Sequence, residues 1–404
     1  MKKIIIIGGG ASGLAAAINS KNKKNEVIIL EKNKECGKKI LITGNGKCNY
    51  YNSNQNINHY HSSNLELIGE FINQERIEKI LPFFESVGIL PDIKDGYYYP
   101  MSNQSISIRN ALVKECENKG VKIIYNCNVN NIIKENDKFI IETNIGKYES
   151  DILVMSTGSK AFPKTGSTGE GYEFAKKFGH SVIKPLPGLV QLISNDKLKD
   201  ASGVRTKVKL TLMEDDIFIT DELGELQITD YGISGIVAMQ LSSYISKGLN
   251  EHKKEKVSIN FLPTIESIDL FLDKLNNNVK NRTISELLDG LLNYKLVNLI
   301  LKKSNINNNE YYDNIDLDRK KRLIDNLISY KIDIQDTKGF DSSQICIGGI
   351  PLSELNNSFE SKIINKLFFT GEIIDLNGDC GGYNLSIAWI SGIEVGTQIK
   401  NVCL

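Results

Sequence analysis

Short apolar runs bounded by glycine and polar turns mark the first part of the chain, and this pattern predicts buried strands. The run Ile4–Ile7 leads into a glycine-rich turn and then a helical stretch with Leu14, Ala15 and Ile18 on one face. A second strand is predicted at Val27–Leu30. Four later runs predict strands separated by polar turns: Val121–Tyr125, Asn128–Ile133, Phe139–Thr143 and Asp151–Met155. Alternating strands and helices of this kind are typical of an α/β fold.

The middle of the chain, about residues 189 to 341, has a different pattern. Pro185 and Pro187 mark its start, because proline neither continues a helix nor donates a hydrogen bond to a sheet. Apolar and polar residues then alternate along Val204–Leu212, which is the period of a half-buried antiparallel strand. Another strand is predicted at Val257–Leu262. This part is therefore predicted to be β-rich, with a helical unit inserted in it at about 264 to 330.

Helical signals identify that unit and the end of the chain. Thr283 and Glu286 have the spacing of a capping box. Apolar residues then recur at helix period: Leu287, Leu288, Leu291, Leu292, Val297, Ile300 and Leu301. The last part, 342–404, contains a predicted strand at Leu367–Phe369, a glycine-dense turn and a final helix from about Tyr383.

Length and composition exclude several classes of protein. A chain of 404 residues exceeds the usual size of one domain, so more than one folding unit is expected. Hydrophobic residues make up 41% and charged residues 24%, which excludes a disordered chain. Lys+Arg and Asp+Glu balance at 49 each, so the basic footprint of a dedicated nucleic-acid-binding protein is absent. We therefore expect a small-molecule substrate rather than a polyanion.

The cysteines and histidines point to a reducing compartment and to no metal. Seven cysteines, odd in number and without a C-x-x-C pair, are typical of free thiols in the cytosol. Of four histidines only His59 and His61 are close in sequence, and an exposed loop is expected there rather than a zinc site. The run Ile4–Ile7 is too short for a signal peptide or a membrane span. A cytoplasmic protein without membrane segments is predicted.

A glycine motif supplies the first chemical signal. Gly8-Gly9-Gly10-Ala11-Ser12-Gly13 fits G-x-G-x-x-G directly between a predicted strand and a predicted helix. In this motif the first glycine makes the tight turn, Gly10 lets a pyrophosphate approach the backbone, and Gly13 lets the helix pack on the strand. The helix start offers free N–H groups to phosphates, and Glu31, which closes the second strand, is suited to ribose hydroxyls. Together these features predict a dinucleotide site.

Motifs farther along the chain predict which dinucleotide binds. A strand ends in a turn at Ser156-Thr157-Gly158, and another does so at Thr370-Gly371-Glu372. Asp375 follows, and then Gly381-Gly382-Tyr383-Asn384 at a helix start. A long ligand with its adenosine on the first strand–helix–strand unit and its other end near the C-terminus fits this distribution, which favours FAD. The N–H groups of the last helix would face the pyrimidine edge of the flavin. An ordinary glycine-rich loop and helix cap is the alternative.

A third glycine-rich stretch, Gly37–Asn49, lies just beyond Glu31 and Lys32. Its glycines would let the backbone run close to a cofactor, and Lys38, Lys39 and Lys47 would balance the cofactor's charge. A flexible surface loop is the alternative. Cofactor motifs thus fall within 1–188 and 342–404, which predicts one discontinuous FAD-binding domain around an inserted domain, 189–341, where substrate choice is expected to lie.

The chain resembles the BaiN-like (YhiN-like) flavoproteins, which include a bile-acid dehydro-reductase and an aminoacetone oxidase. The stretches that carry the resemblance are Gly37–Asn49, Thr165–Tyr172, Tyr231–Gly235 and Gly371–Asp375 through Gly381–Leu385. The resemblance implies an α/β fold with a Rossmann-like FAD-binding domain of the two-dinucleotide-binding-domain type. It also implies an inserted β-barrel with a small helical subdomain, and non-covalent FAD.

The resemblance also assigns site residues. Ser12 and Gly13 would meet the pyrophosphate, Glu31 the ribose and Val129 the adenine, while the 44–49 loop, Asp375 and 382–385 would surround the flavin. The full predicted cofactor set is Gly8, Gly10, Ala11, Ser12, Gly13, Glu31, Lys32, Lys38, Lys39, Gly44, Asn45, Gly46, Cys48, Asn49, Val129, Thr157, Gly158, Gly371, Glu372, Asp375, Gly382, Tyr383, Asn384 and Leu385. The chain departs from the family pattern at Gly96–Pro100, where an Arg is expected, and at Ile228–Asp230, where F-T-H is frequent.

Only one G-x-G-x-x-G occurs, because Gly166, Gly169 and Gly171 have the reversed spacing, so a second nicotinamide-binding domain is not supported. The predicted function is an FAD-dependent oxidoreductase to which NAD(P)H docks transiently. Hydride would pass through flavin N5 to an unsaturated or carbonyl-conjugated small molecule. The alternatives are an oxygen-using amine oxidase and an FAD-binding scaffold or sensor without turnover. A flavoprotein acting on RNA is disfavoured by the neutral charge.

No catalytic acid or base is identified from the sequence. Cys48 is a candidate proton donor or nucleophile, with an inert packed thiol as the alternative. Tyr97–Tyr99 would either shape a substrate pocket, donate a phenolic proton or simply pack. Trp389 is expected in the core, and neither His180 nor His252 has a neighbour in sequence that suggests catalysis. The oligomeric state does not follow from the sequence.

Overall fold

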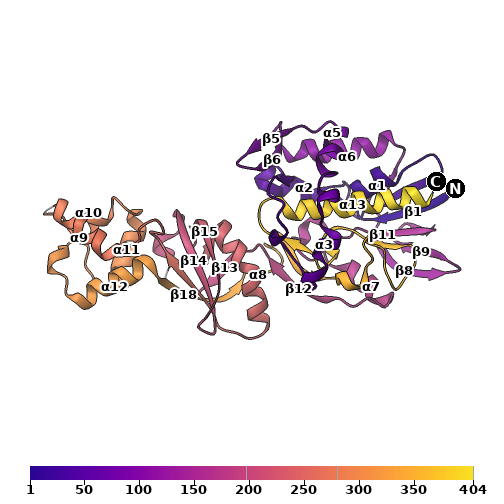
Figure 1. Ribbon diagram of the computed structural model, residues 1–404. Coiled ribbons are helices and arrows are strands. Elements are labelled where there is room, and N and C mark those ends of the chain that lie inside the picture. The colour runs from indigo at the N-terminus through magenta and orange to yellow at the C-terminus, as the bar shows by residue number, and fades with distance from the viewer. Residues whose placement is uncertain (197, 280, 404) are drawn as a thin grey trace. The chain divides into compact units, whose positions relative to one another are not determined.

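The computed structural model describes residues 1–196, 198–279 and 281–403. The chain folds into two compact units (Figure 1). Unit 1 consists of Met1–Leu186 and Gln344–Leu404, and unit 2 consists of Pro187–Ser343. Each unit has its own hydrophobic core, so each contains what a separate domain needs.

Unit 1 is built on a parallel sheet with strand order β20-β11-β1-β2-β7. Its strands are β1 (Lys2–Ile7), β2 (Asn25–Leu30), β7 (Lys122–Ile124), β11 (Ile152–Met155) and β20 (Leu367–Phe369). The central strands are buried on both faces, because helices and a second sheet cover them. This burial explains the unbroken apolar run Ile4–Ile7, which has no polar face to alternate with.

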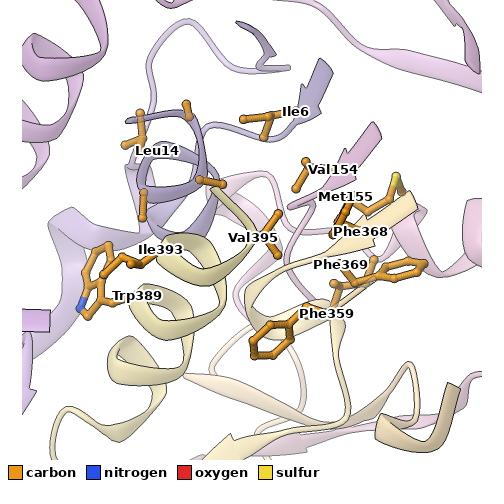
Figure 2. Close-up of a cluster of buried hydrophobic side chains, with 14 of the residues drawn as sticks. Ile6, Leu14, Val154, Met155, Phe359, Phe368, Phe369, Trp389, Ile393 and Val395 are labelled. Carbon is orange, nitrogen blue, oxygen red and sulfur yellow. The ribbon is translucent and has the colours of Figure 1, made fainter. Parts of the chain in front are cut away.

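Helix α1 (Ala11–Ser20) and the long C-terminal helix α13 (Tyr383–Val402) lie side by side (Figure 1). Glycines make this close packing possible, since a β-carbon at Gly392 would lie 2.5 Å from the carbonyl oxygen of Ser12. Figure 2 shows Leu14 of α1 and Ile393 of α13 in the shared core. Trp389 lies there too, fully buried, and its indole N–H donates to the carbonyl of Tyr50 at 3.0 Å. The expectation that Trp389 belongs to the core is confirmed.

The rest of unit 1 consists of small sheets and short helices. The sheets pair β8 (Val129–Glu135), β9 (Lys138–Thr143) and β10 (Gly146–Ser150); β3 (Tyr51–Asn52), β6 (Tyr97–Pro100) and β5 (Pro91–Lys94); β4 (Tyr60–His61) and β21 (Asn377–Gly378); and β12 (Ile183–Gly188) and β19 (Ile345–Gly349). The helices are α2 (Lys38–Ile42), α3 (Ile68–Phe71), α4 (Gln74–Ile77), α5 (Ile80–Ser86), α6 (Ser105–Asn118) and α7 (Glu170–Lys177).

Unit 2 contains a closed antiparallel barrel, which within the described ranges has the strand order β13-β16-β15-β14-β17-β18. These strands are β13 (Leu192–Ser194), β14 (Arg205–Glu214), β15 (Ile217–Ile228), β16 (Gly232–Ser234), β17 (Glu255–Asn260) and β18 (Tyr330–Thr337), and α8 (Ile236–Asn250) packs against them. Val208, Leu210 and Leu212 of β14 point into the barrel core, as the alternation predicts. The α/β fold with an inserted barrel is therefore confirmed.

The helical part of unit 2 comprises α9 (Ile268–Asn278), α10 (Ile284–Leu288), α11 (Tyr294–Lys303) and α12 (Leu317–Ile328). The capping box is confirmed: Thr283 accepts from the backbone of Glu286, whose side chain accepts from the backbone of Thr283. The apolar residues at helix period are divided between two helices, and Leu291 and Leu292 lie between them. Gly290 follows the end of α10, and Asn293 caps α11 by accepting from the backbone of Lys295. Among the residues described, no helix has the length and apolar character to cross a membrane.

Candidate functional site

Four strands of the parallel sheet end together at one edge. Ile7 is in register with Leu30 and with Met155, and Met155 is in register with Phe369. The residues that follow these strands are Gly8, Glu31, Ser156 and Thr370. Ligands of open α/β sheets bind outside the carboxyl ends of the strands. The register therefore gathers segments far apart in the sequence into one candidate cofactor edge.

The glycine turn after β1 is tightly packed at two positions and open at a third. A β-carbon at Gly8 would lie 2.4 Å from the carbonyl oxygen of Ser156, and Gly8 has φ +101. A β-carbon at Gly13 would lie 2.0 Å from the carbonyl oxygen of Gly8. At Gly10 a β-carbon would meet no described atom within 4 Å. The backbone at Gly10 is thus open to a ligand, while Gly8 and Gly13 hold the turn.

The first turn of α1 presents its N–H groups without a side-chain cap. Gly10 is the N-cap and makes no side-chain hydrogen bond, and Ala11 and Ser12 follow it. Ser12 is buried, and a β-carbon at Gly371 would lie 2.6 Å from its Oγ. An uncapped helix start with free donors favours a bound anion such as a pyrophosphate.

Glu31 organises the turn from inside. It is buried, its Oε2 accepts from the backbone N–H of Gly9 at 2.8 Å, and its Oε1 accepts from the backbone and the side chain of Asn33 at 2.8 and 2.7 Å. A carboxylate oxygen accepts more than one hydrogen bond, so these contacts leave capacity for a hydroxyl group. Glu31 therefore shapes the protein turn as well as being a ribose candidate.

Three further predicted residues lie around this turn. The Nζ of Lys38 is 3.3 Å from the side-chain oxygen of Asn33. The backbone N–H of Cys127, two residues before Val129, donates to the carbonyl of Glu31 at 3.0 Å, so the start of β8 lies beside the end of β2. Gly158 has φ +71, a conformation that suits the turn after β11.

The loop after α2 has an unusual backbone. Left-handed φ values occur at Gly44, Asn45, Gly46 and Cys48. A β-carbon at Gly44 would lie 3.0 Å from the backbone nitrogen of Asn49, whereas one at Gly46 would meet nothing within 4 Å. The loop therefore turns sharply on itself and keeps Gly46 open, as expected for backbone that runs against a ligand.

Two buried oxygens at the candidate site lack a hydrogen-bond partner among the described residues. They are Oδ1 of Asn49 and Oγ1 of Thr157. The Asn49 oxygen lies 3.3 Å from where a β-carbon of Gly382 would be, and the Thr157 oxygen lies 2.0 Å from that position at Gly171. Buried polar atoms normally have partners, so these two are suited to hydrogen bonds with a bound molecule.

Two of the predicted lysines, Lys32 and Lys39, are paired with acids. Lys32 pairs with Glu170 at 2.5 Å, and Lys39 pairs with Glu372 at 2.5 Å. Both pairs are partly buried. These pairs neutralise the two lysines, so their charge is shared with the protein rather than directed only at a cofactor.

Asp375 ties three loops together. It is buried; its Oδ2 accepts from the backbone of Ser63 at 2.9 Å and from Ser62 Oγ at 3.2 Å, and its Oδ1 accepts from Gly348 at 3.1 Å. Its carboxylate therefore holds the loop before α13 against β19 and against the residues after β4.

The start of α13 is built from two left-handed glycines, Gly381 (φ +133) and Gly382 (φ +99). A β-carbon at Gly381 would lie 3.1 Å from the ring of Tyr97. Asn384 fastens the preceding loop, because its Nδ2 donates to the carbonyl of Gly378 at 2.6 Å and its Oδ1 accepts from the same residue's N–H at 2.8 Å. The helix start is thereby held close to β6 and to the 44–49 loop.

Tyr383 and Leu385 face the protein. The ring of Tyr383 stacks on His59 with centroids 4.5 Å apart and meets Tyr60 edge-on. Leu385 packs against the core of unit 1. Burial raises the pKa of the Tyr383 phenol to about 12, so it keeps its proton at neutral pH.

A His–Asp–His cluster lies beside this loop, and the expectation of an exposed loop at His59 and His61 is wrong. The Nδ1 of His59 is 2.9 Å from Asp379 Oδ2, and the Nε2 of His61 is 2.7 Å from Asp379 Oδ1. Burial would raise the pKa of Asp379, but hydrogen bonds from the two imidazoles outweigh it and lower the pKa. Within the described ranges, no three His, Cys, Asp or Glu side chains form a metal site. The only sequence signal was the H-x-H spacing, because Asp379 lies more than 300 residues away.

Cys48, Tyr97 and Tyr99 are the remaining side chains predicted to act at the site. Cys48 is fully buried, and burial raises the pKa of its thiol to about 12, which suits the inert alternative rather than a nucleophile. Tyr97 borders Gly381, and the ring of Tyr99 is 3.7 Å from a β-carbon position at Gly44. Two of the three tyrosines therefore contact the glycine loops of the candidate site.

His180 has partners that the sequence did not reveal. Its Nδ1 is 2.6 Å from Glu354 and its Nε2 is 2.7 Å from Ser361 Oγ, which also accepts from the backbone of Ile363 and Ile364. The group is buried, and burial lowers the pKa of His180 although Glu354 opposes this. The arrangement locks a turn before β20 and is structural.

Comparison with known proteins places the chain. The family model "HI0933-like protein Rossmann domain" matches residues 2–398. The chain is 36% identical over 406 residues to the 3-dehydro-bile acid delta(4,6)-reductase of Clostridium scindens, with 98% of both chains covered. It is 28% identical over 404 residues to the ribosomal RNA dihydrouridine synthase of Haemophilus influenzae, again with 98% of both covered.

Two solved structures share the fold. The 3-ketosteroid-delta4-(5alpha)-dehydrogenase of Rhodococcus jostii has a TM-score of 0.53 at 12% identity and covers 99% of this chain and 97% of its own. A flavocytochrome c3 fumarate reductase has a TM-score of 0.51 at 14% identity, with 100% of this chain and 78% of its own covered. The resemblance to the BaiN-like family is thus confirmed, and the chain belongs to the HI0933-like Rossmann family.

Proposed function

We propose that this chain is an FAD-dependent reductase that uses NAD(P)H to saturate a carbon–carbon double bond conjugated to a carbonyl in a small organic molecule. One observation carries the proposal: two relatives with unlike substrates bear names that describe the same change of bonding. A 3-dehydro-delta(4,6) bile acid has a ketone conjugated to ring double bonds, and dihydrouridine is uridine with its carbonyl-conjugated double bond saturated.

The candidate site has features that suit FAD. Gly10 leaves the backbone open, α1 starts without a side-chain cap, and the oxygens of Asn49 and Thr157 lack partners within the described ranges. In this proposal the 8–13 turn holds the pyrophosphate, Glu31 the adenosine ribose, and the 44–49 loop with the start of α13 the flavin ring, without a covalent bond. Bound FAD would accept and donate hydride.

The chain's own groups would orient the reacting ends. The N-terminus of α13 carries a partial positive charge, which stabilises negative charge at a ring edge placed before it. Gly381 and Gly382 bring that helix start within van der Waals range of Tyr97 and Tyr51, so little water fits between them. Cys48 is too deeply buried to take part.

Uracil in RNA is a second candidate substrate. It is favoured by the names of two relatives, of Haemophilus influenzae and of Escherichia coli, which are 28% and 26% identical to this chain. The balance of 49 basic and 49 acidic residues weighs against a polyanion and in favour of a small molecule. Separate assays with ribosomal RNA and with a steroid enone would distinguish these two candidates.

The cofactor site is tested by Gly10→Ala. A methyl group there would meet no protein atom within 4 Å, so the fold should be unchanged while FAD affinity falls at least tenfold. Gly290→Ala is the matched control, because it also meets no atom within 4 Å and lies in unit 2. Affinity is measured by titrating flavin-free protein with FAD. Equal affinity of the two variants would place the cofactor elsewhere.

The reaction is tested by mixing the FAD-loaded protein with NADH or NADPH without oxygen. The flavin absorbance should bleach and return when a 3-keto-delta(4,6) steroid is added. Bleaching by an amine alone would support the amine oxidase alternative, and no bleaching by any donor would support a scaffold or sensor. Return of colour only with ribosomal RNA would select the second candidate. None of the seven cysteines, all of which are described, forms a disulfide, and this supports a cytoplasmic location for the enzyme.

A further inference from the structure

We propose that His61 is the proton donor of this reaction and that Asp379 positions it; this inference rests on the proposed function. Saturating the double bond adds a hydride to one carbon and a proton to its neighbour. NAD(P)H is the reductant and leaves as NAD(P)+, while the two electrons end in the new C–H bond. A group on the protein that faces the substrate and is recharged from solvent can supply that proton.

The cluster is anchored to the loop that precedes α13. Strand β4 pairs antiparallel with β21, with His61 opposite Asn377. The backbone N–H of Asp379 donates to the carbonyl of His59 at 3.0 Å, and its two carboxylate oxygens reach the two imidazoles at 2.9 and 2.7 Å. One carboxylate thus fixes both rings against the same short loop.

Of the two imidazoles, only that of His61 has a free nitrogen. The second nitrogen of His59 is 2.9 Å from the side-chain amide of Asn54, and its ring is stacked on Tyr383. His61 contacts Asp379 through Nε2, and its Nδ1 has no hydrogen bond to any residue that the structure describes. About a third of its side chain is exposed (34%), so solvent can return the proton.

The same loop forms the edge predicted to meet the flavin. Two residues separate Asp379 from Gly382, the N-cap of α13. A β-carbon at Gly381, between them, would lie 3.4 Å from the ring of Tyr383 and 3.1 Å from that of Tyr97. The His–Asp–His cluster and the start of α13 therefore belong to one site.

Among the titratable groups in this region, His61 is the one suited to donate a proton. Burial raises the pKa of Tyr60 and of Tyr383, and burial with the charge of Asp379 raises that of the Cys380 thiol, so all three are weaker acids than usual. Asp379 has a lowered pKa and stays anionic, which stabilises a positively charged ring beside it. A histidine is the side chain that exchanges a proton readily near pH 7.

The test compares His61→Gln with His252→Asn, an exposed histidine of unit 2, as the control. Rapid mixing follows the two half-reactions separately. In the His61 variant NAD(P)H should bleach the flavin within twofold of the unaltered rate, whereas reoxidation by the enone should slow by about 100-fold or more and lose its decline at high pH. Tyr97→Phe is tested alongside, because its phenol is the competing donor.

A second variant tests positioning separately from proton donation. Asp379→Asn should leave bleaching by NAD(P)H within twofold of the unaltered rate and slow reoxidation by the enone, because the carboxylate that holds the His61 ring at 2.7 Å is lost. Reoxidation at the normal rate in His61→Gln or in Asp379→Asn, or a defect only in Tyr97→Phe, would each overturn the inference. If NAD(P)H fails to bleach the unaltered enzyme, the proposed function falls, and the proton-donor role falls with it.

Discussion

Glu255 is a buried acid that faces a second acid, Glu214, and removing its charge should stabilise the protein. It starts β17 and is 2% exposed, and neither carboxylate oxygen has a hydrogen bond within the described part of the chain. A β-carbon at Gly248 of α8 would lie 1.7 Å from Oε1, so no room is left for a water on that side. Glu214 lies directly opposite on β14, and its own charge is paired with Lys253 at 2.8 Å.

The effect of this charge on the free energy of unfolding follows from the pKa of Glu255. Burial, together with the charge of Glu214, raises the pKa of Glu255 from 4.5 to about 7. The folded protein therefore binds this proton more tightly than the unfolded chain, and stability falls as the pH rises from about 4.5 to about 7. A difference of that size corresponds to at most about 3 kcal/mol above pH 7. Glu255→Gln should recover about 1–3 kcal/mol there, and little at about pH 5, where the glutamic acid is already neutral.

The assay is urea unfolding at about pH 5 and about pH 8.5, followed by far-UV circular dichroism. Trp389 is the single tryptophan and lies in unit 1, so its fluorescence reports that unit separately. Glu266→Gln, at an exposed position of unit 2, is the matched control and should change neither midpoint. Two results would contradict this prediction: Glu255→Gln lowers the free energy of unfolding at the higher pH, or it changes that free energy equally at both pH values.

Four further predictions concern the core, a helix cap, a histidine and a thiol. Trp389→Ala should lower the free energy of unfolding by about 3–5 kcal/mol, measured with urea, because the ring is fully buried. Thr283→Ala should cost about 1 kcal/mol and speed hydrogen exchange in α10, where the cap is lost; unchanged exchange would contradict the capping box. Because burial lowers the pKa of His180, the unfolded chain binds its proton more tightly, and stability should fall as the pH drops below 6.5. His180→Asn should flatten that dependence in thermal melts. Cys48 should resist iodoacetamide at pH 8 in the folded protein and react in urea, since burial raises its thiol pKa to about 12; fast labelling of folded protein would argue otherwise.

Local rules explain what could be predicted from the sequence. The parallel strands were found because residues buried on both faces form unbroken apolar runs, as at Ile4–Ile7. The turn at Gly8–Gly13 was found because its backbone demands glycine at fixed spacing, and the structure gives the reason for each position. The apolar period at 287–301 did not show where one helix ends and the next begins, because the period continues across the short break between α10 and α11.

Local sequence patterns did not predict which side chains pair with each other. Lys39 pairs with Glu372, which lies 333 residues away, and no local pattern showed this partner. Asp379 joins His59 and His61 across more than 300 residues, and nothing in either segment signals the other. Glu255 looks like an ordinary strand residue until the barrel closes and places Glu214 opposite it.

The sequence by itself determined the fold class, the dinucleotide turn and the family resemblance, since periodicity, glycine spacing and motifs are properties of neighbouring residues. The tertiary structure alone decided which charges are paired, which oxygens are left without partners and which imidazole is free. Those outcomes depend on burial and on distances between segments that meet only when strand ends align at one sheet edge.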